Sequence, residues 1–119
     1  MEKSGFFNSS GGDRVYDATD FAAYFGNLVS NGIFYKNTTN LMVTPGSGMA
    51  ISIAAGSAWI NGYRYENTED LTKTLVTANG SLPRIDRIVI RWSFLNRNII
   101  AAVLTGTAAA TPSAPVLTR

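Results

Sequence analysis

The first periodic pattern of apolar residues in the chain has the spacing of an α-helix. Large side chains recur at positions i, i+3, i+4, i+7 and i+8, and this spacing places them on one helical face. The stripe consists of Phe21, Tyr24, Phe25, Leu28 and Val29. Asp17 suits the N-cap, and Gly32 suits the position just beyond the helix. The pattern predicts one amphipathic helix over about residues 18–31, with its aromatic stripe packed against a sheet.

From about residue 41 the apolar pattern changes to a period of two, which is typical of β-strands. Apolar residues alternate with small or polar ones over 49–53 and again, for longer, over 85–95. Asn61-Gly62 lies between two apolar runs and indicates a hairpin, because both turn residues must tolerate a positive φ. We therefore predict a mainly β fold: a small β-sandwich or packed antiparallel sheet, with the N-terminal helix laid on it.

The segments on either side of this unit have the composition of an arm and a tail. Residues 1–16 are rich in turn-forming residues around the apolar pair Phe6-Phe7, the candidate partner contact, which we expect to dock on its own domain or on a neighbour. Residues 106–119 have a linker-like composition of mainly Ala, Thr and Pro, and we expect them to lead to distal modules absent from the chain. The expected helix plus β-sandwich domain covers residues 17–105.

The composition narrows the range of functions. Charged residues make up 15% of the chain, against a typical value of about 25%, whereas the hydrophobic share of 45% is ordinary. Such a chain is not expected to be disordered, and its surface has few charges to keep copies apart. The absence of Cys and His excludes thiol and Ser-His-Asp catalysis and the usual zinc sites. We therefore expect no enzymatic activity, no metal and no cofactor.

The formal net charge is only +2, but the charges are unevenly distributed. Residues 1–70 carry four bases and seven acids, a formal −3, whereas residues 71–119 carry six bases and one acid, a formal +5. Arg87 and Arg91 share one strand face and Trp92 points to the other, so they do not form a basic surface with stacking rings. No stretch approaches the roughly 18 apolar residues of a membrane span. We expect no nucleic-acid partner, no membrane insertion, and attraction between the acidic and basic segments within the fold or between copies.

Asp86 falls on the same strand face as Ile88 and Ile90, and the period of two directs this face toward the core. A buried carboxylate needs a partner, which Arg84 or another arginine could provide. A catalytic role would need a second acid or a base in the same pocket, and nothing in the sequence places one there. We therefore interpret Asp86 and Arg84 as a structural salt bridge.

Three aromatic residues flank the predicted hairpin, namely Trp59, Tyr63 and Tyr65. They are candidates either for a platform on which sugar rings stack or for cross-strand pairs that stabilise the sheet. The period of two places Tyr63 and Tyr65 on the same face. The sugar platform therefore requires these two side chains to point away from the core.

Six blocks of the sequence together resemble a known protein family. They are SGFFNS (4–9), GDRVYDA (12–18), FAAYF (21–25), AWINGY (58–63), RIDRIV (84–89) and PVLTR (115–119). These blocks extend over essentially the whole chain. They are similar to the N-terminal module of baseplate and tail-fibre proteins, of the upper-baseplate kind, from long-tailed phages and prophages of Gram-positive bacteria.

The resemblance implies a structural role. In that family this region attaches to the virion, whereas more distal modules recognise the host. The expected function is therefore a non-enzymatic module that anchors a host-adhesion device to the phage tail, contacts other tail or baseplate proteins and forms a homo-oligomer, with a trimer favoured. The expected location is the virion, at the tail tip or baseplate, after synthesis in the cytoplasm of the host bacterium. The alternative function is a carbohydrate-binding module that contacts the host cell surface.

Overall fold

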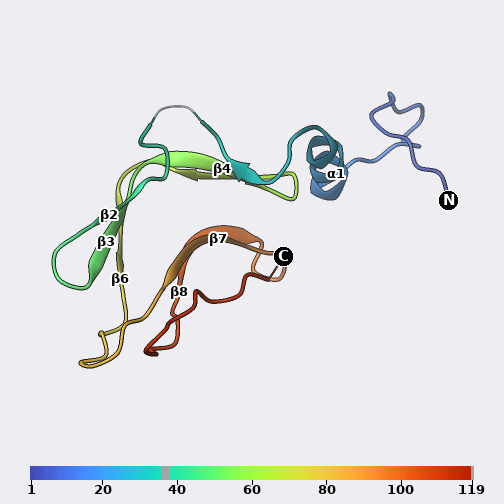
Figure 1. Cartoon of the computed structure of the whole chain (residues 1–119). Helices are drawn as coiled ribbons and strands as arrows, with labels where there is room; N and C mark the ends of the chain where they lie inside the picture. Colours follow the sequence, from blue (N-terminus) through green and yellow to red (C-terminus); the bar gives the residue numbers. More distant parts are fainter. Residues whose placement is uncertain (36–37, 119) are drawn as a thin grey trace.

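A computed structural model describes residues 1–35 and 38–118 of the chain. Among these residues, an N-terminal arm leads into one α-helix, and a series of strands follows (Figure 1). The elements are α1 (Ala18–Leu28), β1 (Gly32–Ile33), β2 (Val43–Pro45), β3 (Ala50–Ile53), β4 (Gly56–Ile60), β5 (Tyr63–Asn67), β6 (Leu71–Thr74), β7 (Arg87–Ser93) and β8 (Asn98–Leu104). This mainly β fold with a short N-terminal helix confirms the fold class predicted from the apolar pattern.

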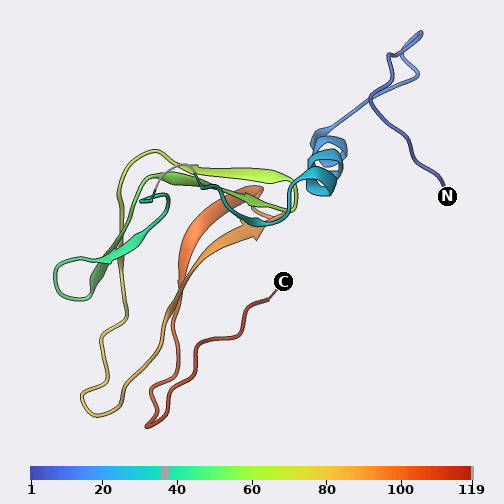
Figure 2. The ribbon, with the colours of Figure 1, turned by 45° about the horizontal axis from the view of Figure 1, so that its top comes forward.

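The strands pair in three small antiparallel sheets. One sheet has the order β1-β4-β5, a second has the order β2-β3-β6, and β7 and β8 form a hairpin of their own. Because β3 continues into β4 and β5 into β6 after short breaks, the first two sheets form one bent ribbon. This ribbon curves over the β7–β8 hairpin (Figure 1 and Figure 2). The result is two facing layers, a small sandwich-like arrangement.

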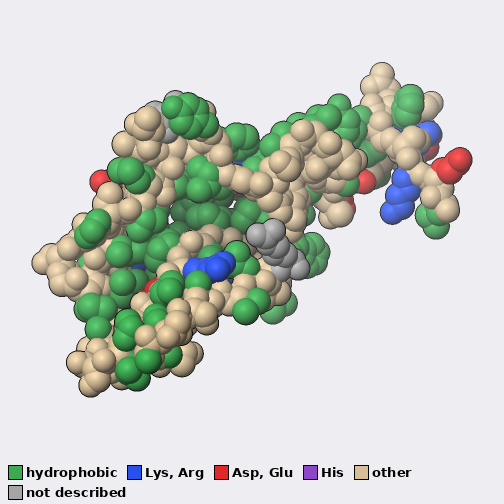
Figure 3. Space-filling view, in the orientation of Figure 1, with side chains coloured by type: hydrophobic (Ala, Val, Ile, Leu, Met, Phe, Trp, Pro, Cys, Tyr) green, Lys and Arg blue, Asp and Glu red, His purple; other side chains and the backbone are tan. Residues whose placement is uncertain are grey.

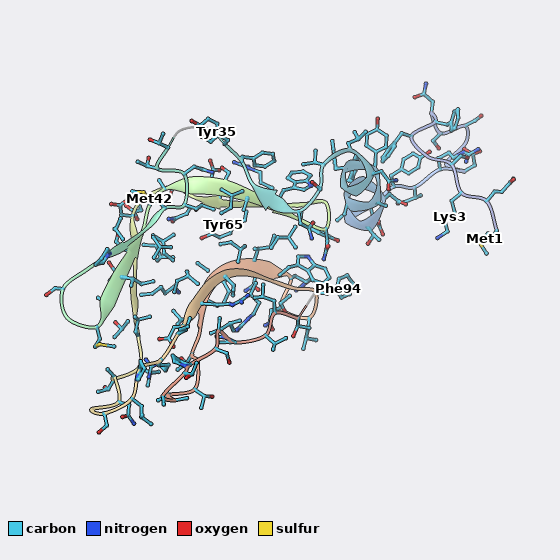
Figure 4. All side chains as sticks on the ribbon, viewed as in Figure 1. Met1, Lys3, Tyr35, Met42, Tyr65 and Phe94 are labelled. Carbon is cyan, nitrogen blue, oxygen red and sulfur yellow. The ribbon has the colours of Figure 1, made fainter. Side chains whose placement is uncertain are left out.

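The core lies between these two layers and is small. Its buried side chains are Leu41, Ile53, Ala58, Tyr65 and Ala101. Partly buried hydrophobic residues from both layers pack against them, namely Ile51, Leu71, Ile88, Ile90 and Ile99. Figure 4 shows Tyr65 between the ribbon and the hairpin. The large side chains of α1 are not included in this core, because Ala22 is the one buried residue of that helix.

The β4–β5 turn has the backbone that its sequence predicts. Asn61 and Gly62 have φ values of 51° and 80°, and Ile60 pairs with Tyr63 directly across the turn. Gly62 is also the contact point for α1, because a Cβ atom at this position would overlap the carbonyl oxygen of Ala22. The turn therefore needs glycine both for its left-handed backbone and for the close approach of the helix.

The helix begins as predicted. Asp17 is the N-cap, and its Oδ1 accepts hydrogen bonds from the backbone N–H groups of Thr19 (2.8 Å) and Asp20 (3.1 Å). Oδ2 of Asp20 accepts a hydrogen bond from the N–H of Asp17 in return (3.0 Å). This reciprocal pair is a capping box, which satisfies backbone donors that the first helical turn leaves free.

The predicted end of the helix at about residue 31 is wrong, because α1 ends at Leu28. Gly32 is not a helix stop but the first residue of β1, where it pairs with Trp59. Oδ1 of Asn31 accepts a hydrogen bond from the N–H of Asn61 (2.8 Å), and its Nδ2 donates to Oδ1 of Asn61 (3.3 Å). The chain must be extended after Leu28 to reach these partners.

The side of α1 that contacts the sheet also differs from the prediction. Ala22 and Gly26 face the β4–β5 turn. An α-helix turns by about 100° per residue. On this basis the centre of the aromatic stripe lies about 100° around the helix axis from the side that carries Ala22 and Gly26. Phe21, Tyr24 and Leu28 are consequently 48%, 51% and 66% exposed. Phe25 does reach the sheet, where its ring lies edge-on to that of Trp59. The expectation that the whole stripe packs against a sheet is therefore wrong for the single chain.

The tail is held more firmly than its composition predicts. Residues 105–118 contain no helix or strand and run back along the β7–β8 hairpin (Figure 1 and Figure 2). Gly106 donates its N–H to Oδ1 of Asp86 (2.8 Å), and Ala109 donates its N–H to the carbonyl oxygen of Pro83 (3.0 Å). The beginning of the 106–119 segment therefore belongs to the folded unit, and residue 119 lies outside the described residues.

We predict that Gly62→Ala destabilises the contact between α1 and the sheet. The substitution forces a left-handed backbone on a residue with a side chain and overlaps the Ala22 carbonyl, so the expected loss in free energy of unfolding is about 2 kcal/mol or more. Gly80→Ala is the control, because no atom lies within 4 Å of the added Cβ, and less than about 0.5 kcal/mol is expected there. Denaturant titrations at one protein concentration measure both values, and equal losses would contradict this role of Gly62.

Candidate interaction surface

Aromatic rings form a continuous series from the arm across α1 to the sheet. Neighbouring ring centroids along the series lie 5.0–6.0 Å apart, in the tilted or edge-on arrangements that aromatic pairs favour. This aromatic series consists of Phe6, Tyr16, Phe21, Tyr24, Phe25, Trp59 and Phe34. It connects the arm and the helix to the β1-β4-β5 sheet.

Phe6 and Phe7, the candidate partner contacts, are held by the fold of their own arm. Phe6 has a φ of 65°, and its ring centroid lies 5.0–5.1 Å from those of three other rings of the series. The N–H of Phe7 donates to the Tyr16 hydroxyl (2.9 Å), which donates in turn to the Phe7 carbonyl oxygen (3.2 Å). In the single chain Phe6 thus docks on its own helix. Phe7 is 61% exposed, with the Arg14 guanidinium 5.9 Å from its ring centre.

The outer side of the aromatic series is open to solvent. Four residues of α1, called the helix stripe below, are between 40% and 66% exposed: Phe21, Tyr24, Phe25 and Leu28. Figure 3 shows hydrophobic side chains gathered at the surface over the helix. Large contiguous apolar patches, above a few hundred Å², are uncommon on monomeric proteins and typically mark interaction sites. The helix stripe is therefore the first candidate interaction surface.

A second apolar surface lies at the end of the β7–β8 hairpin nearest to α1. It is an open hollow of about 570 Å³, lined by the hydrophobic side chains of Tyr63, Trp92, Phe94, Leu95 and Ile99. Phe94 and Leu95 are 67% and 90% exposed, and Figure 4 shows Phe94 at this end of the hairpin. This surface is not among the sites predicted from the sequence. The sequence feature that could have indicated this surface is the apolar pair Phe94-Leu95 directly before the turn, because two successive apolar residues interrupt the alternation of a strand.

The three hairpin aromatics do not form a common platform for a sugar. Trp59 pairs with Arg64 in the β4–β5 register. Because side chains alternate along a strand, Trp59 points to the face opposite that of Tyr63 and Tyr65. Tyr65 lies in the core, where burial raises the pKa of its hydroxyl, and the ring centroids of Tyr63 and Trp92 are 5.8 Å apart. The candidate sugar platform is therefore contradicted by the direction of these side chains.

Arg84 and Asp86 form the salt bridge that the sequence predicts. Nε and Nη2 of Arg84 donate to Oδ1 (2.8 Å) and Oδ2 (3.0 Å) of Asp86, and both side chains are only 12% exposed. The guanidinium also donates to the carbonyl oxygens of Val76 (2.7 Å) and Thr77 (3.2 Å). The hydrogen bonds that Asp86 accepts from Arg84 make the largest contribution to lowering its pKa below the usual value. The hydrogen bond from the N–H of Gly106 lowers this pKa further. The pair thus connects the loop after β6, the start of β7 and the tail.

The other ion pairs of the described residues are also local in sequence. They are Arg14–Asp13, at 4.0 Å, and Arg64–Glu66. Among the described residues, no ion pair joins the acidic segment (residues 1–70) to the basic segment (residues 71–119). Within the same residues, no three acidic side chains are grouped so that they could hold a metal ion. The charges of the two segments that the structure describes are therefore not paired across the boundary between them.

Comparison with known proteins gives no match: no family model, no curated protein and no solved structure aligns with this chain. None of the described residues belongs to a helix with the length and apolar character that a membrane span requires. The function must therefore be inferred from the two apolar surfaces and from the sequence blocks.

We predict that Asp86→Asn lowers the free energy of unfolding by about 3 kcal/mol, because it leaves the largely buried Arg84 guanidinium without its charged partner. The exposed Arg64–Glu66 pair provides a matched control, in which Glu66→Gln is expected to cost less than about 1 kcal/mol. Denaturant titration at one protein concentration measures both. The structural role of Asp86 would be refuted if the two substitutions cost the same.

The lowered pKa of Asp86 also predicts how stability depends on pH. Because the unfolded chain, with its ordinary pKa near 3.8, binds the proton more tightly than the folded chain, ionised Asp86 stabilises the fold. This contribution is complete above the unfolded-state pKa and is lost as the pH falls through the folded-state pKa. The difference in free energy of unfolding between wild type and Asp86→Asn should therefore shrink as the pH falls from about 5 to about 2. A difference that is constant over this range would contradict the assignment.

Proposed function

We propose that this chain is a structural attachment module of a phage tail. In this proposal it is non-enzymatic, assembles with copies of itself and with other baseplate proteins at the tail tip, and anchors a host-adhesion device there. The six sequence blocks that resemble baseplate and tail-fibre proteins support the phage assignment. The helix stripe and the hollow support a function through protein contact, and a trimer is the expected assembly.

The observation that carries the proposal is the amount of surface that the single chain leaves accessible. Its accessible area is 9016 Å², against about 6,300 Å² for a compact monomer of 12.8 kDa. Its radius of gyration is 19.1 Å, against about 13.5 Å for a compact domain of 119 residues. A chain that buries so little of its own surface gains further stability when a partner covers the rest.

Protein contact accounts for the exposed surfaces better than sugar binding does. A sugar platform needs exposed rings on one face, whereas Trp59 points to the face opposite that of Tyr63 and Tyr65. The hollow is lined mainly by apolar side chains, and such a surface suits the apolar face of another protein element. The low share of charged residues, 15%, also suits a surface that is covered in an assembly.

The molar mass of the isolated chain in solution tests the assembly. We expect light scattering coupled to gel filtration to give a multiple of 12.8 kDa, and three times that mass for the trimer. The reason is that burial of the exposed apolar surface favours association. A single-chain mass at every concentration measured would contradict the proposed self-association.

The location in the virion is tested separately. Gold-labelled antibodies against residues 1–119 are applied to phage particles from a host that encodes the chain, and the particles are imaged by electron microscopy. The proposal predicts label at the tail tip and none on the head. Label on the head, or none on intact particles that contain the chain, would refute the tail assignment even if the chain self-associates.

A further inference from the structure

We infer that the helix stripe of one copy packs into the hollow of a neighbouring copy, so that copies join head to tail through one repeated contact. The inference rests on the self-association in the proposed function and specifies the two surfaces that produce it. It makes the stripe and the hollow the two halves of a single interface.

The helix stripe is held away from the hollow of its own chain. α1 is fixed to the β4–β5 turn by the close approach at Gly62 and by the hydrogen bonds between Asn31 and Asn61. Thr19 of the same helix lines the hollow. Leu28 of the stripe lies about 180° around the helix from Thr19, at about 100° per residue. The stripe therefore faces away from the hollow beside it, and only another molecule can join the two surfaces without moving the helix.

The two surfaces are complementary in their chemistry. Both are apolar, and the hollow, at about 570 Å³, has room for large side chains. Residues 1–28, which hold the arm and the stripe, carry four acids and two bases, a formal −2, and α1 has no basic residue in its last turn. Arg64 and Arg97 line the hollow, and among the described residues Arg97 has no ion-pair partner. Opposite charges thus favour the approach of an arm and helix to the hollow.

A second copy is the partner that these surfaces specify. Every copy carries one stripe and one hollow, so a head-to-tail contact covers both surfaces on each copy when the ring closes. The chain exposes about 2,700 Å² more than a compact monomer, an area to which the extended arm also contributes, and a second copy can cover part of it. A single unrelated partner that covered both surfaces would need an apolar hollow for the stripe and an apolar projection for the hollow.

Two exposed leucines allow the surfaces to be tested one at a time. Leu28→Asp places a charge in the stripe and Leu95→Asp places one in the hollow, and these side chains are 66% and 90% exposed in the single chain. Substitutions at such positions are expected to leave the fold of the single chain intact. Val76→Asp, at a residue that is 58% exposed and outside both surfaces, is the matched control. We expect both test variants to lose self-association in light scattering, while Val76→Asp keeps the wild-type mass.

A mixture of the two variants then determines which surfaces meet. Leu28→Asp keeps an intact hollow, and Leu95→Asp keeps an intact stripe. An equimolar mixture should therefore contain pairs of unlike chains held by one contact, with a mass that neither variant reaches alone. If stripes instead met stripes, Leu95→Asp alone would assemble like the wild type, and this result would overturn the inference.

The outcomes distinguish the inference from the proposed function. If the wild type assembles but Leu95→Asp has no effect, or if the mixture of folded variants forms no pair, the inference is overturned and self-association stands. If the wild type is a monomer, both fail. Circular dichroism checks that each variant keeps the wild-type spectrum. Leu28→Ser and Leu95→Ser, which introduce no charge, replace any variant that does not keep it.

Discussion

The close approach of α1 to the β4–β5 turn determines which surfaces this chain leaves exposed. Gly62 has the positive φ that the turn requires and lacks the Cβ that would exclude the helix backbone. Because Ala22 and Gly26 make this contact, Phe21, Tyr24 and Leu28 of the helix stay about half exposed or more. Apolar burial is worth about 25 cal/mol per Å², so the exposed stripe is a substantial source of free energy for contact with another molecule.

The two layers of strands depend on polar contacts as well as on their small core. The Arg84–Asp86 pair connects three segments through hydrogen bonds in addition to its own charges. Bidentate charged pairs of this kind define geometry closely because both partners are planar. The pair therefore holds the start of β7 and the beginning of the tail in place.

The elements predicted correctly are those that depend on neighbours in sequence. The N-cap at Asp17 and the turn at Asn61-Gly62 use residues within a few positions of one another, and both could be predicted. The end of α1 depends instead on the hydrogen bonds between Asn31 and Asn61, thirty positions apart. The course of the tail similarly depends on a distant partner, the Asp86 carboxylate. Contacts of this range leave no periodic signal in the sequence.

The surroundings of the helix stripe could not be predicted for a different reason. An amphipathic pattern indicates that one face of a helix is to be covered, but not whether the same chain covers it. The pattern alone therefore predicts that the stripe lies in the core of the same domain. In the structure, the one buried residue of α1 is Ala22, which is not part of the stripe. The hollow is not predicted because the pattern predicts a strand over 85–95, whereas β7 ends at Ser93 and Phe94 and Leu95 are exposed beyond it.

The proposed role of the exposed apolar surfaces is that other copies bury them and thereby raise the free energy of unfolding. The dependence of Tm on protein concentration is the sharpest test, because association stabilises the folded form by mass action. Tm should rise steadily over about a hundredfold range of concentration. A Tm that does not change over this range would show that the single chain is stable without partners and would contradict the role given to these surfaces.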